Sequence, residues 1–373
     1  MEVVCERQRL RQTLGLVSHV VPSKTTKPVL QHFRLRAEAG ALTIEATDLE
    51  VAVRQRMDAV RIRKDGVCTV LARTLSDFVR DGESEEVSLR LDGTNLAVAS
   101  GRDSGVLPTG DVDEFPTIPR FGEGEAIEIA GTAWSRMAGR TVFAAAREAG
   151  RYAINGVLVE VSGEQLKLVA TDGRRLALTF IPLPQAPAGR RTAIVPIRGV
   201  EQFRRAVDAM GDPSSPVTLA LGEREFAFRA EATEVFSRVL EGEFPRYEGV
   251  VPKDPPNAAE VDRQVFLQRL RCVANFTSEE ARGVRLEFGE KNLRFSAKSA
   301  GRGEGKSEME VVLRGRPTEV AFNPDYLRDA VEAAGAGEET NTFRFEFTDR
   351  NSPGKLLFGE DFCYVVMPIA QEA

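Results

Sequence analysis

The sequence predicts an α+β protein made of three similar units, each an antiparallel sheet with two helices on one side. Two observations carry this prediction. A hairpin of alternating apolar and polar residues occurs three times along the 373 residues, and helical segments with one apolar face recur between the hairpins. A chain of this length is expected to hold two or three domains, and the internal repetition makes three the prediction.

Three hairpins of one design begin the repeated pattern. They align on Leu42, Leu166 and Leu293, and each has an alternating strand, a polar turn containing glycine, and a second alternating strand. The first two end on the same Ala-Thr-Asp string, whose last residues are Asp48 and Asp172. We therefore expect equivalent hairpins over residues 33–48, 157–172 and 284–297.

A second set of alternating strands closes each unit. Segments 87–98, 217–228 and 343–347 carry the same alternation, and the first two are followed by the Phe-Pro pairs at 115–116 and 244–245. Stretches rich in glycine, proline and charge come next, as is typical of linkers. The predicted domains are 1–121, 126–252 and 258–373.

Six amphipathic helices are predicted between the strands, over 6–20, 72–80, 133–148, 197–208, 262–277 and 324–333. The first five carry a net positive charge and the last a net negative one, although the whole chain has a net charge of −6. Arg136, Arg140 and Arg147 would share one helical face. Charged surface helices are common, but a positive helical layer on an acidic protein also suits a surface that meets phosphates without reading sequence.

Familiar catalytic constellations are not expected. The chain has only two histidines, His19 and His32, and its four cysteines form no CxxC pair, so neither a metal site nor a cofactor is predicted. Residues 300–307 nearly spell a phosphate-binding loop, but the alternation after them predicts a strand where such a loop needs a helix. No apolar run could span a membrane and the first residues lack a signal-peptide pattern, so we expect a cytoplasmic protein.

Short strings in a fixed order point to one family. The most specific is Val-Ala-Thr-Asp-Gly-Arg-Arg-Leu-Ala-Leu at 169–178, and the others lie at 28–30, 47–50, 154–156, 194–196, 242–247, 282–286, 322–327 and 364–368. Together they resemble the bacterial sliding clamps, the β subunits of DNA polymerase III. The match covers the whole chain and agrees with the three repeats.

The resemblance implies three DNA-clamp domains and a ring formed by head-to-tail dimerisation of two chains. Such a ring encircles double-stranded DNA without reading sequence and tethers the replicative polymerase, so the protein would not be an enzyme. The implied partners are a second copy of the chain, the DNA polymerase III alpha subunit, the clamp loader, and repair or translesion polymerases that dock through short peptides. A three-repeat protein-binding scaffold without DNA binding is the alternative, and it would not need the arginine-rich helices.

The resemblance also assigns site residues. The DNA contacts would be Lys24, Arg73, Arg80, Arg151, Tyr152 and Arg198. A cleft between the second and third domains would receive partner peptides through Ile154, Thr171, Gly173, Arg174, Arg175, Leu176, Pro245, Val250, Asn323, Tyr326, Val365, Met367, Pro368 and Ile369. At the dimer interface, Val106 and Leu107 would meet Asn275 and Phe276 of the other chain. Arg174 stands where the family usually has His or Tyr, so Arg174 and Arg175 are expected to favour an acidic or polar flank on the peptide.

Overall fold

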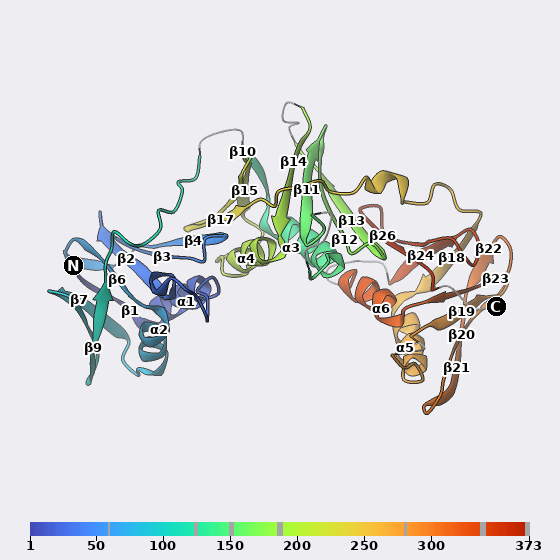
Figure 1. Ribbon diagram of the computed structural model, residues 1–373, viewed down its shortest axis with the longest axis horizontal. Helices are drawn as coiled ribbons and strands as arrows, with labels where there is room; N and C mark the ends of the chain where they lie inside the picture. The colour runs from blue at the N-terminus through green and yellow to red at the C-terminus, as the bar shows by residue number, and fades with distance from the viewer. Residues whose placement is uncertain are drawn as a thin grey trace. The chain divides into compact units, whose positions relative to one another are not determined.

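The computed structural model describes residues 1–58, 60–122, 126–148, 153–184, 189–279, 282–335 and 341–369 (Figure 1). The chain divides into two compact units. The first contains Met1–Trp134 and Arg198–Val239, and the second contains Ser135–Ile197 and Leu240–Ala373. The central third of the chain therefore contributes to both units.

The first unit is built on a 13-stranded sheet. Its order from one edge to the other is β10-β15-β16-β17-β4-β3-β2-β6-β9-β8-β7-β1-β5. The strands are β1 (Glu2–Glu6), β2 (His32–Glu38), β3 (Ala41–Thr47), β4 (Val51–Met57), β5 (Arg61–Lys64), β6 (Gly66–Leu71), β7 (Glu86–Asp92), β8 (Asn95–Ser100), β9 (Asp103–Gly110), β10 (Ala126–Ala130), β15 (Pro216–Leu221), β16 (Glu225–Ala230) and β17 (Thr233–Arg238).

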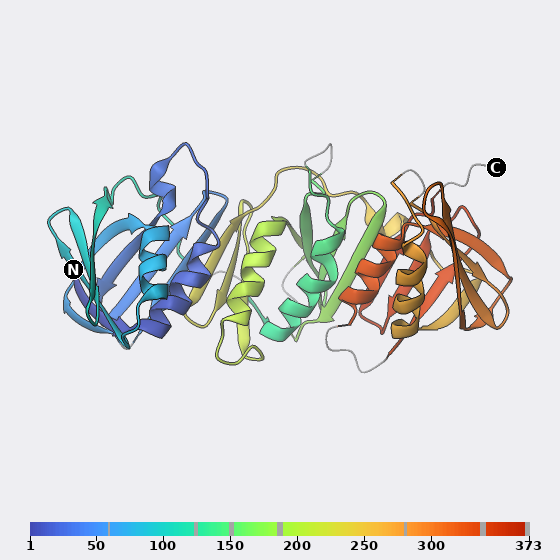
Figure 2. The same ribbon diagram turned by 90° about the horizontal axis from the view of Figure 1, so that it is seen from below.

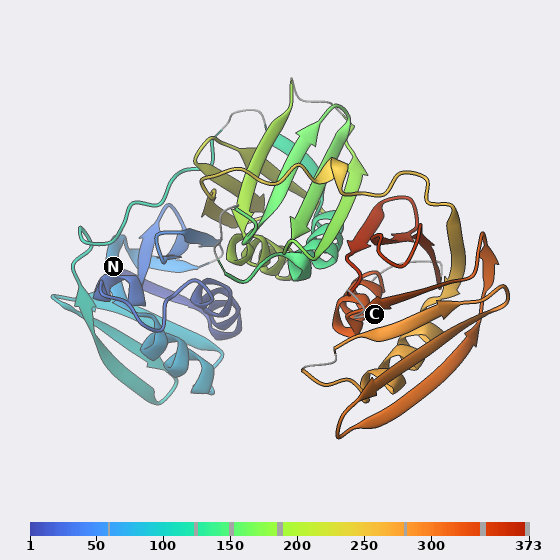
Figure 3. The same ribbon diagram turned by 45° about the vertical axis from the view of Figure 1, so that its right-hand side comes forward.

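The second unit has a nine-stranded sheet, ordered β14-β11-β12-β13-β26-β25-β24-β18-β22, and a four-stranded sheet, ordered β21-β20-β19-β23. In Figure 3 the green strands of the larger sheet lie side by side. Its strands are β11 (Gly156–Ser162), β12 (Gln165–Thr171), β13 (Arg175–Pro182), β14 (Arg191–Pro196), β18 (Asn257–Asp262), β22 (Val312–Arg314), β24 (Thr342–Phe347), β25 (Gly354–Phe358) and β26 (Phe362–Val366). The smaller sheet has β19 (Val284–Phe288), β20 (Asn292–Ser299), β21 (Gly303–Glu310) and β23 (Thr318–Phe322).

One strand order recurs throughout the described residues. The groups β4-β3-β2-β6, β13-β12-β11-β14 and β21-β20-β19-β23 are equivalent, and so are β9-β8-β7-β1, β17-β16-β15-β10 and β26-β25-β24-β18. In each group three antiparallel strands follow one another along the chain, and the fourth strand leads directly into a helix. The predicted repeats are confirmed, since all three hairpins aligned on Leu42, Leu166 and Leu293 form antiparallel pairs.

The six predicted helices are present among the described residues. They are α1 (Arg7–Ser18), α2 (Ala72–Asp81), α3 (Gly131–Thr141), α4 (Ile197–Asp208), α5 (Arg263–Ala274) and α6 (Pro324–Ala333). Asp262 caps α5 and Asn323 caps α6 through side-chain oxygens that accept backbone N–H groups. Within the first unit, α1, α2 and α4 cover one face of the sheet (Figure 2), and the Gln202 amide donates to the carbonyl of Leu16.

The expected helix over 133–148 is wrong in its second half. The helix ends at Thr141, whose hydroxyl donates to the carbonyl of Met137, and a short 3-10 turn occupies Val142–Ala144. Beyond it, the N–H of Ala146 bonds to the carbonyl of Ile154 and draws the chain away from the helix axis. Arg147 therefore does not share a helical face with Arg136 and Arg140.

The Thr-Asp strings form the same turn in two repeats. The Thr47 hydroxyl accepts the N–H of Leu49 and donates to the first carbonyl of β4, while the Thr171 hydroxyl accepts the N–H of Gly173 and donates to the first carbonyl of β13. The third residue is left-handed in both turns, with φ of 79° at Leu49 and 84° at Gly173. The string that nearly spells a phosphate-binding loop, 300–307, is a turn only over its first three residues, because strand β21 already begins at Gly303. It leads into this strand and not into a helix, as the alternation predicted.

Aromatic side chains form much of the core in both units. In the first unit Trp134 is fully buried with its ring 5.6–6.0 Å from the rings of Phe203, Phe226 and Phe228. In the second unit Phe266 from α5 packs edge-on against Phe295 and Phe343 from the sheets. The helices are therefore fixed to the sheets by large apolar contacts, which hold their outer faces in place.

Candidate functional site

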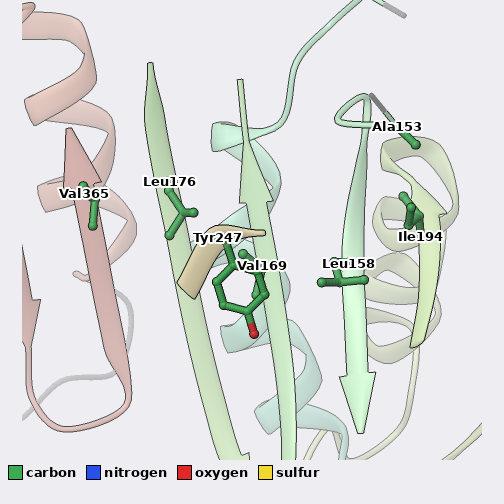
Figure 4. Packing of buried hydrophobic residues seen from close by; sticks show 7 residues of the cluster. All are labelled: Ala153, Leu158, Val169, Leu176, Ile194, Tyr247 and Val365. Carbon is green, nitrogen blue, oxygen red and sulfur yellow. The ribbon is translucent and has the colours of Figure 1, made fainter. Parts of the chain in front are cut away.

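An apolar cluster lies where β13 and β26 join the central and last repeats. Leu176 and Val365 are direct cross-strand partners, although they are far apart in the chain. Figure 4 shows them on adjacent strands, with Tyr247 of the linker drawn close to Val169 on the next strand. The cluster contains Ala153, Leu158, Val169, Leu176, Ile194, Tyr247 and Val365, with Leu178, Leu240, Phe244, Val251 and Cys363 packed against it. The predicted proximity of Leu176 and Val365 is thus present.

Two large apolar side chains beside this cluster remain open to solvent. Val250, in the linker that carries Tyr247, is 46% exposed, and Met367, just beyond β26, is 42% exposed. The N–H of Met367 donates to the carbonyl of Arg174 at 2.8 Å, which ties the end of the chain to the Thr171 turn. Exposed apolar side chains next to an apolar cluster and a polar turn are the kind of surface that binds a short apolar peptide.

Arg175 does not provide a free positive charge. Its guanidinium donates to carboxylate oxygens of Asp172 and Asp329 at 3.0 and 2.8 Å, and to the carbonyl of Phe143 at 2.7 Å. It also lies 4.5 Å from the ring centre of Tyr326, and its side chain is 11% exposed. Because its donors are engaged within the protein, the expectation that Arg175 favours an acidic peptide flank is wrong. Arg174 is exposed.

The remaining predicted cleft residues lie in the same unit but are not all equally open. Thr171 is buried in its turn and Gly173 is exposed, whereas Ile154, Pro245, Asn323, Tyr326, Pro368 and Ile369 are half-buried. The carbonyl of Tyr326 accepts the Tyr364 hydroxyl, and the N–H of Ile369 donates to the carbonyl of Ala321. These contacts hold the last described residues against the domain.

An equivalent joint in the first unit is filled by the chain itself. There β4 pairs with β17, and Ala52 and Phe236 are the cross-strand partners. The linker residues Phe115, Ile118 and Phe121 are 4%, 4% and 9% exposed and complete an apolar cluster with Ala52, Ala227 and Phe236. The same spacing in the second linker gives Phe244, Tyr247 and Val250. The last position is therefore buried at the first joint and exposed at the second.

Arginines fix the linker at the first joint. The Arg54 guanidinium donates to Glu45, Glu234 and the carbonyls of Ile118 and Pro119. Burial opposes ionisation of Glu45, but hydrogen bonds and charges from Arg34 and Arg54 outweigh it and hold the pKa of that carboxyl below its usual value. Glu45 thus remains ionised within a network that helps to close this joint.

The described DNA-contact candidates are exposed cations, and the arginines among them have carboxylate partners. Arg80 lies 2.6 Å from Asp77 and 2.8 Å from Asp81, and Arg73 lies 3.7 Å from Asp77. Arg198 lies 2.6 Å from a carboxylate oxygen of Asp48, whose side chain is 6% exposed. Lys24 is exposed, with no carboxylate within 4.0 Å in the described ranges. Arg151 and Tyr152 lie outside the described residues.

Two features change the interpretation of the helical charges. Arg140 is 2% exposed and forms an ion pair of 3.0 Å with Asp361, so its place in an exposed arginine layer is wrong. The acidic side chains of the net negative helix α6 form ion pairs within the protein. Asp329 pairs with Arg175, and Glu332 pairs with Arg271. The negative charge of α6 is thus largely matched by neighbouring arginines.

The dimer candidates lie at two strand edges. Residues 103–108 of β9 have β8 on one side only, because β6 pairs with no more than Thr109 and Gly110. On β9, Val106 is 67% exposed and faces away from the core, while Leu107 lies opposite the buried Leu96. Strand β21 pairs only with β20 among the described residues. Phe276, beyond α5, packs against Gly305 of β21, and Asn275 ends that helix as an exposed residue.

Some members of the apolar cluster were not predicted. Phe244 and Tyr247 belong to the linker whose Phe-Pro pair the repeats had already aligned with the pair at 115–116, and that alignment was the available signal. Burial, followed by the nearby Glu160 and Glu248, raises the pKa of Tyr247 to about 12. No group of three or more His, Cys, Asp or Glu side chains in the described part of the chain could hold a metal ion. No described helix is long and apolar enough to span a membrane.

Comparison with known proteins covers the whole chain. Residues 1–119, 128–246 and 248–370 match the N-terminal, central and C-terminal domain models of the DNA polymerase III beta subunit. The chain is 31% identical to a beta sliding clamp of Pseudomonas putida and 30% identical to one of Escherichia coli, over 99% of this chain and 100% of theirs. A crystal structure of the DNA polymerase III subunit beta from Pseudomonas aeruginosa is 31% identical, covers 100% of both chains and has a TM-score of 0.92.

Proposed function

The chain belongs to the DNA polymerase III beta subunit family, the beta sliding clamps, and from this premise we propose how its residues contact DNA, a second copy and client proteins. The family is the non-catalytic processivity factor of the DNA polymerase holoenzyme, so the chain is a DNA sliding clamp with DNA and polymerase partners. We place its three domains at 1–121, 126–252 and 258–373. We place the protein in the cytoplasm, with no cofactor.

The clamp is proposed to close as a head-to-tail homodimer through β9 and β21. At both described joints, the third strand of one group pairs with the third strand of another, as β4 does with β17 and β13 with β26. Only β9 and β21 remain without such a partner among the groups described. An unpaired strand edge is a template for another strand, and pairing β9 with β21 of a second copy repeats the same rule.

The register of that pairing follows from the two joints. The first residue of β4 pairs with the fifth of β17, Val51 with Ser237, and the first residue of β13 pairs with the fifth of β26, Arg175 with Val366. Applied to β21 and β9, this rule pairs Gly303 with Leu107, Gly305 with Gly105, and Lys306 with Ser104 of the other copy.

The register brings two aromatic rings together. A Cβ on Gly105 would touch the ring of Phe78 at 3.6 Å, and one on Gly305 would overlap the ring of Phe276. Directly paired residues point to the same side of a sheet. Phe78 and the Phe276 of the other copy are therefore proposed to pack over the glycine pair, beside Leu107. Val106 faces the other side of the sheet, so Leu107 and Phe276 carry the apolar contact.

DNA is proposed to contact Lys24, Arg73, Arg80, Arg198, Arg151 and Tyr152 through its phosphates. Contacts to phosphates carry no sequence information, which suits a ring that must move along any sequence. Client peptides from the polymerase alpha subunit, the clamp loader and other polymerases are proposed to bind beside Leu176 and Val365, where Val250 and Met367 are exposed. A related clamp, from Pseudomonas aeruginosa, has been crystallised bound to griselimycin.

The observation that carries the proposal is the recurrent strand order, which leaves β9 and β21 as complementary free edges. The test is retention by topology. After loading onto nicked circular DNA by a bacterial clamp loader, the protein is expected to stay bound in high salt and to leave when the circle is cut. Release that follows salt and ignores cutting would contradict the ring and favour a scaffold that does not encircle DNA.

A further inference from the structure

We propose that Asp48, Asp77 and Asp81 weaken the hold of the clamp on DNA by occupying the arginines that face it. This inference rests on the proposed DNA contacts and adds a role for residues that they do not include. A sliding ring needs contacts with phosphates that form and break quickly, and an arginine already paired with a carboxylate offers less to a phosphate than a free cation.

The α2 pair of acids is the clearest case. Arg80 donates through Nη1 to Asp77 at 2.6 Å, and through Nε and Nη2 to Asp81 at 2.8 and 3.1 Å. One guanidinium therefore has three hydrogen bonds to two carboxylates of its own helix. Arg73, one turn before Asp77, lies 3.7 Å from the other oxygen of that aspartate. The two arginines and two aspartates on α2 cancel in charge, so this helix meets a phosphate with little net attraction.

Asp48, in the turn between β3 and β4, pairs with an arginine of helix α4. One of its carboxylate oxygens accepts the N–H groups of Glu50 and Val51 and fixes the turn into β4, and the other lies 2.6 Å from Arg198. Asp48 is largely buried whereas Arg198 is 55% exposed. A carboxylate that is fixed by its own turn thus pairs with the guanidinium of an exposed arginine. The equivalent aspartate, Asp172, likewise fixes its turn with one oxygen and accepts the Nε–H of Arg175 with the other, although Arg175 is largely buried.

Lys24 provides the contrast, since it has no carboxylate within 4.0 Å in the described ranges and is exposed. Each phosphate contact contributes about 0.9 to the slope of log affinity against log salt on duplex DNA. A free cation such as Lys24 is expected to contribute close to that full amount. Arg80, already neutralised by its own helix, is expected to contribute much less.

The experiment measures the salt dependence of binding of the full-length dimer to a short labelled duplex. Asp77→Asn with Asp81→Asn, and separately Asp48→Asn, should strengthen binding and steepen the slope by up to about 0.9 for each arginine released. Asn keeps the oxygen with which Asp48 caps its turn. Adding Arg80→Gln to the α2 pair should remove the part of the gain that Arg80 supplies and leave the part due to Arg73, whereas Arg80→Gln alone should change the slope little.

The control is Glu86→Gln, which frees Arg61 of β5 from an ion pair of 2.7 Å with Glu86 of β7. Glu86 alternates with the buried Val87 and Leu89, so its side chain points away from the core. Equal gains in this control would show a general charge effect and overturn the proposal. Unchanged slopes in the aspartate variants, with a flatter slope in Lys24→Gln, would also overturn it while leaving the DNA contacts intact. If Lys24→Gln has no effect either, the proposed DNA contacts themselves are wrong.

Discussion

The guanidinium of Arg229 lies 4.1 Å above the ring of Phe121, a buried linker residue of the first joint. Val250 holds the same place in the linker of the second joint, and it is exposed. Two joints with the same strand pairing and the same linker spacing thus differ at one position. A buried phenylalanine completes the first joint, and an exposed valine leaves the second one incomplete. We therefore expect client peptides to bind at the second joint rather than at the first.

Replacing Phe121 by Ala should therefore destabilise the protein far more than replacing Val250. Loss of a buried phenylalanine costs about 3–5 kcal/mol, whereas a change at an exposed surface position stays within about 0.5 kcal/mol. Urea unfolding of Phe121→Ala and Val250→Ala measures both. Similar losses in the two variants would contradict the assignment of the first linker as core.

The client surface should depend on Leu176 and Met367 together. Met367 is exposed, so its burial by a peptide contributes roughly 1.5–3 kcal/mol, whereas Leu176 is already buried and belongs to the cluster beside it. Leu176→Ala combined with Met367→Ala should therefore abolish binding of a labelled polymerase C-terminal peptide. Val312→Ala, at an exposed valine on β22, is the matched control and should bind normally. Equal affinity in the double variant and the unaltered chain would exclude this surface. Loss of the dimer in the double variant would show that these residues serve only as core.

Dimer strength should depend on Gly305. A Cβ at this position would overlap the Phe276 ring, so Gly305→Ala should displace the ring and weaken the contact with the second copy. Gly15→Ala is the control, because its Cβ would meet nothing within 4 Å on α1 and should raise stability by about 0.5–1 kcal/mol. Sedimentation velocity at falling concentration measures the effect. A Gly305→Ala dimer as tight as the original would contradict the β9–β21 contact.

Acid should loosen the first joint through Glu45. Its folded pKa is lower than its unfolded value, so its contribution to stability is complete above about pH 4.5 and is lost as the pH falls through the folded pKa. Glu45→Gln should therefore be less stable at neutral pH and should show a flatter decline below that value. Parallel acid limbs for the two proteins in urea unfolding would rule out this role.

Much of the fold could be predicted because its signals are local. The alternation in the three hairpins and the apolar stripes of the helices depend on neighbouring residues, and these elements appeared as expected. The end of α3 could not be predicted, since it depends on a bond between Ala146 and Ile154. Likewise, the sequence of α3 cannot show that Arg140 is buried against Asp361, which comes from a distant turn.

The parts of the site that belong to the repeats or to the family strings could be predicted. The side-chain contacts between segments far apart in the chain could not. Leu176 and Val365 meet because β13 and β26 join, which the resemblance implied. The partners of Arg175 come from α6 and from the turn after α3, so its engaged state is visible only in the structure. The free edges of β9 and β21 emerge only once the third strands of the other four groups have been paired with one another.

The most direct measurement of the central claim is a covalent closure of the ring. With the exposed Cys272 replaced by Ser, the variant Ser104→Cys with Lys306→Cys places cysteines at positions that the proposed register pairs. Oxidation should link two chains through both interfaces and trap the loaded protein on circular DNA even in detergent, while cutting the circle should release it. The variant Ser104→Cys with Glu310→Cys, out of register, should link poorly. Efficient linking of the second pair, or loss of the linked dimer from intact circles, would contradict a ring closed by β9 and β21.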